Sequence, residues 1–175
     1  VPDLPYPVFV FTGTMLWQVF TESITMPQMQ VSASKSMVAK LNFPREALLL
    51  SGLYKVFFGV LIKLVVLVPV VLLFGIVPDA HLALVPVAMV ALVLAGMSIG
   101  LLLVPVGTLY SDVGRFVPMA TQFLMYLTPV VYAMPKLGIL AKLFGSNPIT
   151  PLILNGRAWL TGGATPMPFQ FIAVV

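Results

Sequence analysis

The 175-residue chain is 60% hydrophobic and 8% charged, whereas soluble domains carry about 25% charged residues, so both a soluble globular domain and a disordered chain are excluded. Its net charge of +4 comes from nine Lys and Arg residues scattered between apolar runs, which indicates a membrane topology signal and argues against a nucleic-acid partner. The chain has no cysteine and a single histidine, so we expect no metal site and no cofactor. The composition leaves a membrane protein, whose main surroundings are membrane lipid.

The first apolar run, at about 6–26, is rich in aromatic and hydroxyl-bearing residues. A span surrounded only by lipid would not carry so many polar groups, so we expect this one to face a protein interior or a pathway. Thr14, Trp17, Gln18 and Thr21 recur at spacings of three and four, which predicts that they share one helix face. This face either packs against other spans or lines a pathway through the membrane.

A polar stretch at about 27–46 follows the first span. Within it, the spacing of Met37, Val38 and Leu41 predicts a short amphipathic helix in or near the membrane interface. Pro44 ends that helix, because proline disfavours helical geometry in the residue before it, and can open the next helix.

Three more complete spans are predicted at about 47–76, 82–109 and 117–134. The connections between them are a tight turn at 77–81 and a short polar segment at 110–116. Gly96 and Gly100 form a GxxxG pair in the third span, and we expect this pair to permit close helix contact within the subunit.

The pattern changes at 136–165, where two apolar pieces of ten or so residues are separated by a Gly-Ser-Asn-Pro sequence. At 1.5 Å per residue each piece reaches about 15 Å, half of the hydrocarbon thickness. Two half-length helices predict a re-entrant hairpin on the outer side of the membrane. Another span starts at about 167, so we expect the sequence to be a piece of a longer protein, cut at both ends.

Three charged residues lie within the predicted spans or close to them. Glu22 and Lys55 lie at similar depths, so we expect them to form an ion pair. Lys63 lies eight residues further, near the middle of the membrane. The alternative for these residues is a structural pair or a side chain that extends to the interface.

The distribution of cations predicts the orientation of the chain. The segments at 27–46 and 110–116 should be cytoplasmic, since they carry Lys35, Lys40, Arg45 and Arg115. Three cations on the predicted outer side oppose this rule: Lys136, Lys142 and Arg157.

Three segments in order carry a family resemblance. They are "GTMLWQVFTESI" with "MVAKLNFPREALLLS", then "LYSDVGRFVPMATQFLMYLTPVVYAMP", and finally "NPITPLILNGRAWLTGG". From about residue 6 to 170 the chain resembles the membrane subunit of polysaccharide ABC exporters, the ABC-2 permeases that export O-antigen, teichoic acid or capsular chains. That family usually has Arg-Asp at the second cytoplasmic loop, where this chain has Ser111-Asp112 and Arg115.

The resemblance implies a six-span subunit, a homodimer with a continuous pore, and a separate ATP-binding subunit in the bacterial cytoplasmic (inner) membrane. It implies that the segment at 27–46 couples to the ATPase. The residues expected to serve this coupling are Lys35, Lys40, Arg45, Glu46, Asp112 and Arg115. The conduit candidates are Trp17, Gln18, Thr21, Lys63, Tyr126 and Tyr132. In such a conduit Trp17 would stack on sugar rings, and Lys63 could meet a phosphate of the lipid-linked substrate.

The expected function is therefore that of a permease, which moves a lipid-linked polysaccharide and catalyses no reaction itself. No glycine-rich stretch ends in the Gly-Lys-Ser/Thr sequence that binds nucleotide phosphates, so ATP hydrolysis is expected in the partner. The alternatives are an ABC-2 permease for a drug or a lipid, an unrelated secondary transporter with a re-entrant helix, and a membrane scaffold without transport activity.

Overall fold

The computed structural model describes residues 5–34, 45–75, 80–110, 112–132, 147–162 and 166–174. All regular secondary structure in these ranges is helical, which confirms the expected all-α class. The helices in chain order are α1 (Tyr6–Ala33), α3 (Arg45–Leu73), the 3-10 helix η1 (Ala80–Leu84), α4 (Val85–Leu109), α5 (Val113–Leu127), α7 (Ile149–Leu160) and α8 (Pro168–Val174).

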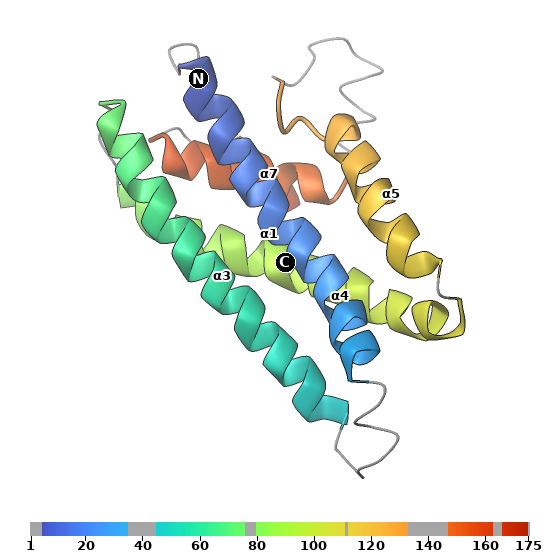
Figure 1. Ribbon diagram of the computed structural model, residues 1–175. Helices are drawn as coiled ribbons and strands as arrows, with labels where there is room; N and C mark the ends of the chain where they lie inside the picture. Colours follow the sequence, from blue (N-terminus) through green and yellow to red (C-terminus); the bar gives the residue numbers. More distant parts are fainter. Residues whose placement is uncertain are drawn as a thin grey trace.

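Helix α1 lies at the centre of the bundle and contacts α3, α4, α5 and α7 (Figure 1). Its buried face carries Leu16 and Phe20, which belong to one apolar core together with Met89 and Leu92 of α4 and Leu152 of α7. Apolar side chains gain little from leaving lipid, so helix association in a membrane depends on close packing of this kind.

Gly96 and Gly100 allow α4 to approach the backbone of α1 closely where the two helices cross. A methyl group on Gly96 would lie 2.6 Å from Cβ of Ser23 and 2.8 Å from the carbonyl oxygen of Phe20. A methyl group on Gly100 would lie 2.5 Å from the carbonyl oxygen of Ile24. The predicted role of the GxxxG pair, close contact within the subunit, is confirmed.

Among the residues that the structure describes, two helices are long and apolar enough to cross a membrane: Glu46–Leu73 and His81–Leu109. Helix α5 has 15 residues and therefore measures about 22 Å, less than the hydrocarbon thickness. Helix α1 has 28 residues but a more polar sequence. That α1 and α5 cross the bilayer stays a prediction.

Helix α1 continues to Ala33, although a loop was predicted to begin at residue 27. Pro27 lies inside the helix and is buried. Proline is tolerated in membrane helices because neighbouring groups can satisfy the backbone atoms that it leaves unpaired. The predicted interfacial helix around 37–41 lies outside the described residues.

Helix α5 begins earlier and ends earlier than the span predicted at 117–134. It ends at Leu127 because the next residue, Thr128, has the extended backbone (φ −109°, ψ 138°) that a following proline favours. Pro129 therefore separates the helix from a short non-helical segment that continues to Tyr132.

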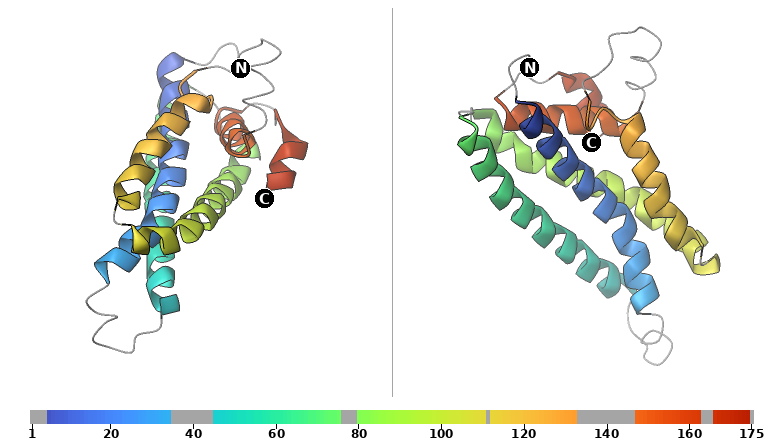
Figure 2. Two further views of the ribbon diagram at one scale, coloured as in Figure 1. Left: turned by 90° about the vertical axis from the view of Figure 1, so that its right-hand side faces the viewer. Right: turned by 45° about the horizontal axis from the view of Figure 1, so that its top comes forward.

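The described helices end in two groups, at opposite ends of the bundle. The end of α1, the start of α3 and the α4–α5 connection lie at one end (Figures 1 and 2). The start of α1, the end of α3, the start of α4, the end of α5 and the whole of α7 lie toward the other. The segments predicted to be cytoplasmic are thus connected to the same end of the bundle.

Candidate transport surface

The polar side chains of α1 lie on two faces: one set is buried (Thr12, Ser23, Gln28 and Gln30), and the stripe of Thr14, Gln18, Thr21 and Glu22 follows the more open face. Gln18 and Glu22 are exposed, and Thr14 and Thr21 are half-buried. The stripe therefore does not pack inside this chain, and the other expectation, that it faces a pathway, stays a prediction. The apolar face of α1 fills the contacts with α4 and α7, so the polar stripe is left on the open side of the bundle.

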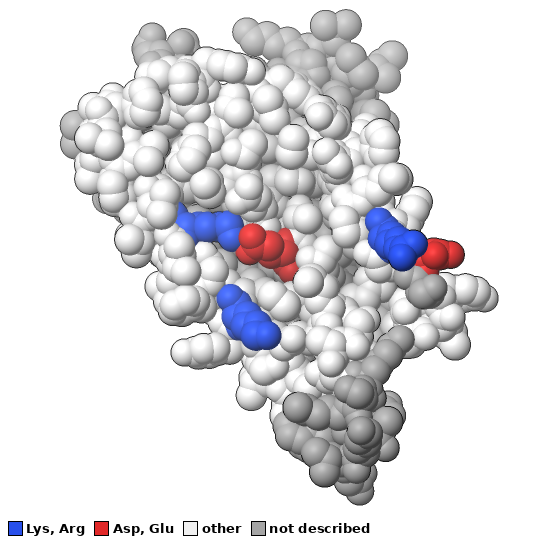
Figure 3. Space-filling model, viewed as in Figure 1, with Lys and Arg blue, Asp and Glu red and all other residues white. Residues whose placement is uncertain are grey.

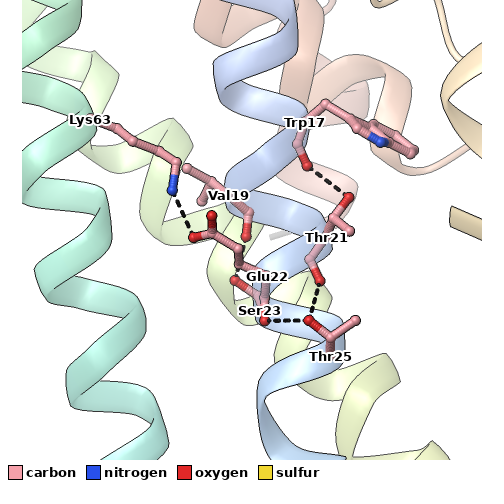
Figure 4. A network of polar contacts seen from close by, with 7 residues as sticks. All are labelled: Trp17, Val19, Thr21, Glu22, Ser23, Thr25 and Lys63. Carbon is pink, nitrogen blue, oxygen red and sulfur yellow. Dashed lines mark hydrogen bonds and ion pairs between the residues drawn. The ribbon is translucent and has the colours of Figure 1, made fainter. Parts of the chain in front are cut away.

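The hydroxyl groups of this stripe are satisfied within the helix. Thr21 Oγ1 donates to the carbonyl of Trp17 at 3.1 Å, and Thr25 Oγ1 donates to the carbonyl of Thr21 at 3.0 Å (Figure 4). Thr14 Oγ1 donates to the carbonyl of Val10 at 2.9 Å. Such bonds let a helix carry hydroxyls at membrane depth without a partner on another helix.

Trp17 is not part of the open face. It is 4% exposed, and its ring packs against Phe20 with the centroids 5.3 Å apart. Adjacent residues of a helix point about 100° apart, so Trp17 turns into the core while Gln18 stays outside. The proposed stacking of sugar rings on Trp17 is therefore not available on the surface of this chain.

The charged pair on this face differs from the one predicted. Lys63 Nζ donates to Glu22 Oε2 at 2.7 Å, so Glu22 pairs with Lys63 and the predicted pair with Lys55 is wrong (Figure 4). Lys55 Nζ instead donates to Gln30 Oε1 at 3.4 Å. Lys63 is thus largely neutralised, and its positive charge is less available to a substrate phosphate than the sequence suggested.

Charged side chains are sparse on this side of the molecule and gather in two separate groups (Figure 3). One group is formed by the side chains of α1 and α3, where Glu22 and Lys63 are 47% and 13% exposed. The other belongs to the start of α5, where Asp112 and Arg115 are exposed. The wide uncharged surface between them is the kind that lipid or another protein subunit covers.

Helix α5 carries an exposed aromatic and apolar face beside α1. Its members are exposed by 59–66%: Phe116, Met119, Phe123 and Tyr126. At the end of α5 the chain folds back, and Tyr132 Oη donates to the carbonyl of Tyr126 at 2.6 Å. The two tyrosines proposed for the conduit are therefore brought together at one end of α5.

The candidates for ATPase coupling are only partly described. Glu46 is exposed in the first turn of α3, and Asp112 is the N-cap residue of α5, where a carboxylate is favoured by the helix dipole. Arg45 begins α3, but its side chain lies outside the described part of the chain, as do Lys35 and Lys40 entirely.

Sequence reasoning missed the polar residues of α7. Asn155 is fully buried; its Nδ2 donates to the carbonyl of Met167 and its Oδ1 accepts from the N–H of Met167, both at 3.0 Å. It thereby holds the chain where it returns toward α8. Arg157, assigned only to topology from the sequence, is 5% exposed. Buried polar groups in a short apolar segment were the available signal.

The comparisons with known proteins agree with this architecture. The sequence profile of the ABC-2 type transporter family matches residues 3–156. Two O-antigen export system permease proteins RfbA of Klebsiella pneumoniae are each 23% identical over 172 residues, which cover 97% of this chain. The chain spans 66% of the length of each of these relatives.

The profile match covers most of the chain, and the helices that it covers include both of those able to cross a membrane. The open polar face, the exposed face of α5 and the enclosed α7 all lie largely within that match. This chain is a membrane protein and belongs to the ABC-2 type transporter family.

Proposed function

We propose that this chain is part of the permease subunit of an ABC exporter that moves a lipid-linked polysaccharide across the bacterial cytoplasmic membrane. The observation that carries the proposal is the likeness to the two O-antigen export permeases, which runs along 97% of the chain. A separate ATP-binding subunit supplies the energy, and the subunit itself crosses the inner membrane several times.

The conduit in this proposal runs along the open polar face of α1. Gln18 and Glu22 are exposed there, and Lys63 is bonded to Glu22, so the face offers hydrogen-bonding groups without a large net charge. A polysaccharide presents many hydroxyl groups, and a polar, nearly neutral wall exchanges hydrogen bonds with them without holding them at one point. Tyr126 and Tyr132 supply aromatic surface at one end of this path.

The same face requires a cover, because Glu22 and Gln18 would otherwise contact lipid. We propose that a second copy of the subunit supplies it, so that the polar stripes of two copies enclose one shared path. The exposed face of α5 beside it would form the apolar part of the contact. A homodimer of this kind leaves the interior of each subunit dry and places the polar groups at the centre of the assembly.

The ATP-binding subunit is proposed to dock at the end of the bundle where α1 ends and α3 begins. Glu46 is exposed there, and Asp112 and Arg115 lie at the start of α5, toward the same end. The residues proposed for the docking site are Lys35, Lys40, Arg45, Glu46, Asp112 and Arg115. Movement of the ATPase would reach the conduit through α1 and α3, which contact each other.

Loss of the subunit should leave lipid-linked polysaccharide on the cytoplasmic side of the membrane and remove the chains from the cell surface. The test uses the source strain with the gene deleted. The strain is complemented either with the intact subunit or with a variant that carries both Arg45→Glu and Glu46→Lys, and surface polysaccharide is compared. The variant should insert normally, fail to retain the ATPase in a pull-down and resemble the deletion. The Lys136→Glu variant, altered on the predicted outer side, is the control. Unchanged surface polysaccharide in the deletion strain would contradict the proposed cargo.

Cysteine at Gln18 should react with a water-soluble maleimide while the exporter hydrolyses ATP, because the conduit fills with water and substrate. These 175 residues contain no cysteine, so within them the reaction reports on position 18 alone. Val19→Cys is the matched control, since its side chain lies one residue away and is 0% exposed. Labelling of Gln18→Cys several-fold above Val19→Cys is expected. Equal, background labelling of the two variants would leave α1 with a packing role only.

A further inference from the structure

Arg157 of α7 is a buried cation bonded to backbone carbonyls. The residue is 5% exposed. Its Nη2 donates to the carbonyl oxygen of Val130 and, at 3.4 Å, to that of Pro129. Its guanidinium carbon lies 3.9 Å from the centroid of the Phe9 ring, in a cation–π contact. The guanidinium thus joins α1, α7 and the segment after α5.

Gly13 makes this three-way contact possible. A methyl group at Gly13 would overlap both Arg157 Nη2 and the carbonyl oxygen of Val130. Any larger residue would push α1 away from the end of α5. The guanidinium therefore lies in a space that α1 leaves free for it, beside the aromatic ring of Phe9 one turn earlier on the same helix.

The start of α7 makes a second contact with the same segment. Asn147 Nδ2 donates to Thr128 Oγ1 at 3.0 Å, and Asn147 Oδ1 accepts from the N–H of Ile149 at 3.1 Å. Thr128 Oγ1 in turn donates to the carbonyl of Leu124 at 2.9 Å. Asn147, just before α7, and Arg157, near its end, thus hold the non-helical segment at 128–130 against α7.

The contact that Arg157 makes with α1 and the segment after α5 leaves some of its hydrogen-bond donors without partners among the described residues. Arg157 Nε and Nη1 are buried and have no hydrogen-bond partner among the described residues. Unmatched donors on a buried charged group are costly, whereas water would satisfy both of them if α7 and the end of α5 separated. A specific contact with unmatched donors is suited to alternate between a closed and an open arrangement.

We propose that Arg157 is a latch that holds the end of α5 against α7 and α1, and that the latch opens and closes in each transport cycle. The proposal rests on the proposed function for the existence of that cycle. Opening frees the carbonyls of Pro129 and Val130 and exposes the guanidinium to water. Arg157 acts here as a positioning residue, because it sets where α5 ends and contacts no reacting group.

Cysteine at Val130, whose side chain is 0% exposed, reports on the latch. The full subunit with its ATP-binding partner is labelled in membranes that admit a maleimide from both sides, with and without ATP. Labelling of Val130→Cys should be low without ATP and rise about fivefold with it. In the Arg157→Ala background labelling of Val130→Cys should be high in both conditions. Arg157→Lys keeps the charge but loses the planar guanidinium group with its several donors, so labelling without ATP should lie between those of the unchanged protein and of Arg157→Ala. Leu92→Cys, 0% exposed in α4, should stay unlabelled throughout.

Two results would overturn the latch. The first is an absence of any effect of ATP on Val130→Cys in the otherwise unchanged protein, which means that this contact is static. The second is equal labelling of Val130→Cys and Leu92→Cys after Arg157→Ala, which means a general loss of structure. If Arg157→Ala does not accumulate, Phe9→Leu removes the ring face instead and should raise labelling without ATP; unchanged labelling then overturns the proposal. Because labelling requires no cargo, the polysaccharide assignment can fail while the latch stands.

Discussion

Replacing Gly100 by alanine should lower the free energy of unfolding by about 1–3 kcal/mol, the range typical of overpacked helix contacts. The added methyl group would lie 2.5 Å from the carbonyl oxygen of Ile24 and 3.1 Å from both its carbonyl carbon and Cγ of Pro27. Two of these three atoms belong to the backbone of α1, so no rotation of a side chain can relieve the contact. The helices must move apart, and the packing around Gly96 is weakened with them.

Gly114→Ala is the control for this substitution. Gly114 also lies in a helix, and a methyl group there would meet no atom within 4 Å. Alanine gains at most roughly 0.5–1 kcal/mol of helix propensity over glycine at either position, so a loss of stability at Gly100 alone reports the contact with α1. Unfolding in SDS followed by tryptophan fluorescence is the measurement, since Trp17 lies in the core beside the crossing. Equal stability of the two variants would show that the α1–α4 crossing does not need glycine.

Replacing Asn155 by leucine should lower the free energy of unfolding by about 1–3 kcal/mol, because it leaves the N–H of Met167 without its partner, while the carbonyl of Met167 still accepts from the N–H of Phe171 at 3.0 Å. Asn155 is 0% exposed, and both of its hydrogen bonds to Met167 measure 3.0 Å. Leucine has a similar size but can neither donate nor accept. The connection between α7 and α8 should open before the rest of the chain unfolds.

The effect of Asn155→Leu is checked by hydrogen exchange of the Met167 amide and by SDS unfolding. Exchange at Met167 should accelerate at least tenfold, while the amides of α4 keep their protection. Gln170→Leu is the matched control, since Gln170 lies nearby in α8 and is exposed. A Met167 amide that stays as protected as in the unchanged chain would mean that another group holds this connection.

Local features of the sequence were sufficient for several elements. The apolar run of α4 predicted its end at residue 109, and the four-residue spacing of Gly96 and Gly100 predicted their close contact. Both depend only on neighbouring residues, because helix length and face follow from periodicity. The early end of α5 was also readable in principle, since Pro129 disfavours helical geometry at Thr128.

The features that were missed depend on how helices are placed against one another. Glu22 could reach either Lys55 or Lys63, which lie two turns apart on one helix face, and the relative shift of α1 and α3 decides for Lys63. The spacing of Trp17 places it with Thr14, Gln18 and Thr21 on one predicted face. Its side chain is nevertheless buried, because the edge of this face that carries Trp17 turns toward the neighbouring helices. No periodicity shows that Arg157 will meet carbonyls 27 and 28 residues earlier in the chain.

The enclosure of α7 has a consequence for biogenesis. All residues of this 12-residue helix except Leu154 are buried, and Gly156 lies against Ala88 of α4 and Leu16 of α1. This helix is about 18 Å long, which is too short for it to insert stably across the bilayer without neighbouring helices. During synthesis α1 and α4 must therefore already be inserted and paired when residue 160 leaves the ribosome. If the pairing of α1 with α4 is weakened, α7 loses the surface against which it packs. Such a chain is expected to be degraded by membrane quality-control proteases.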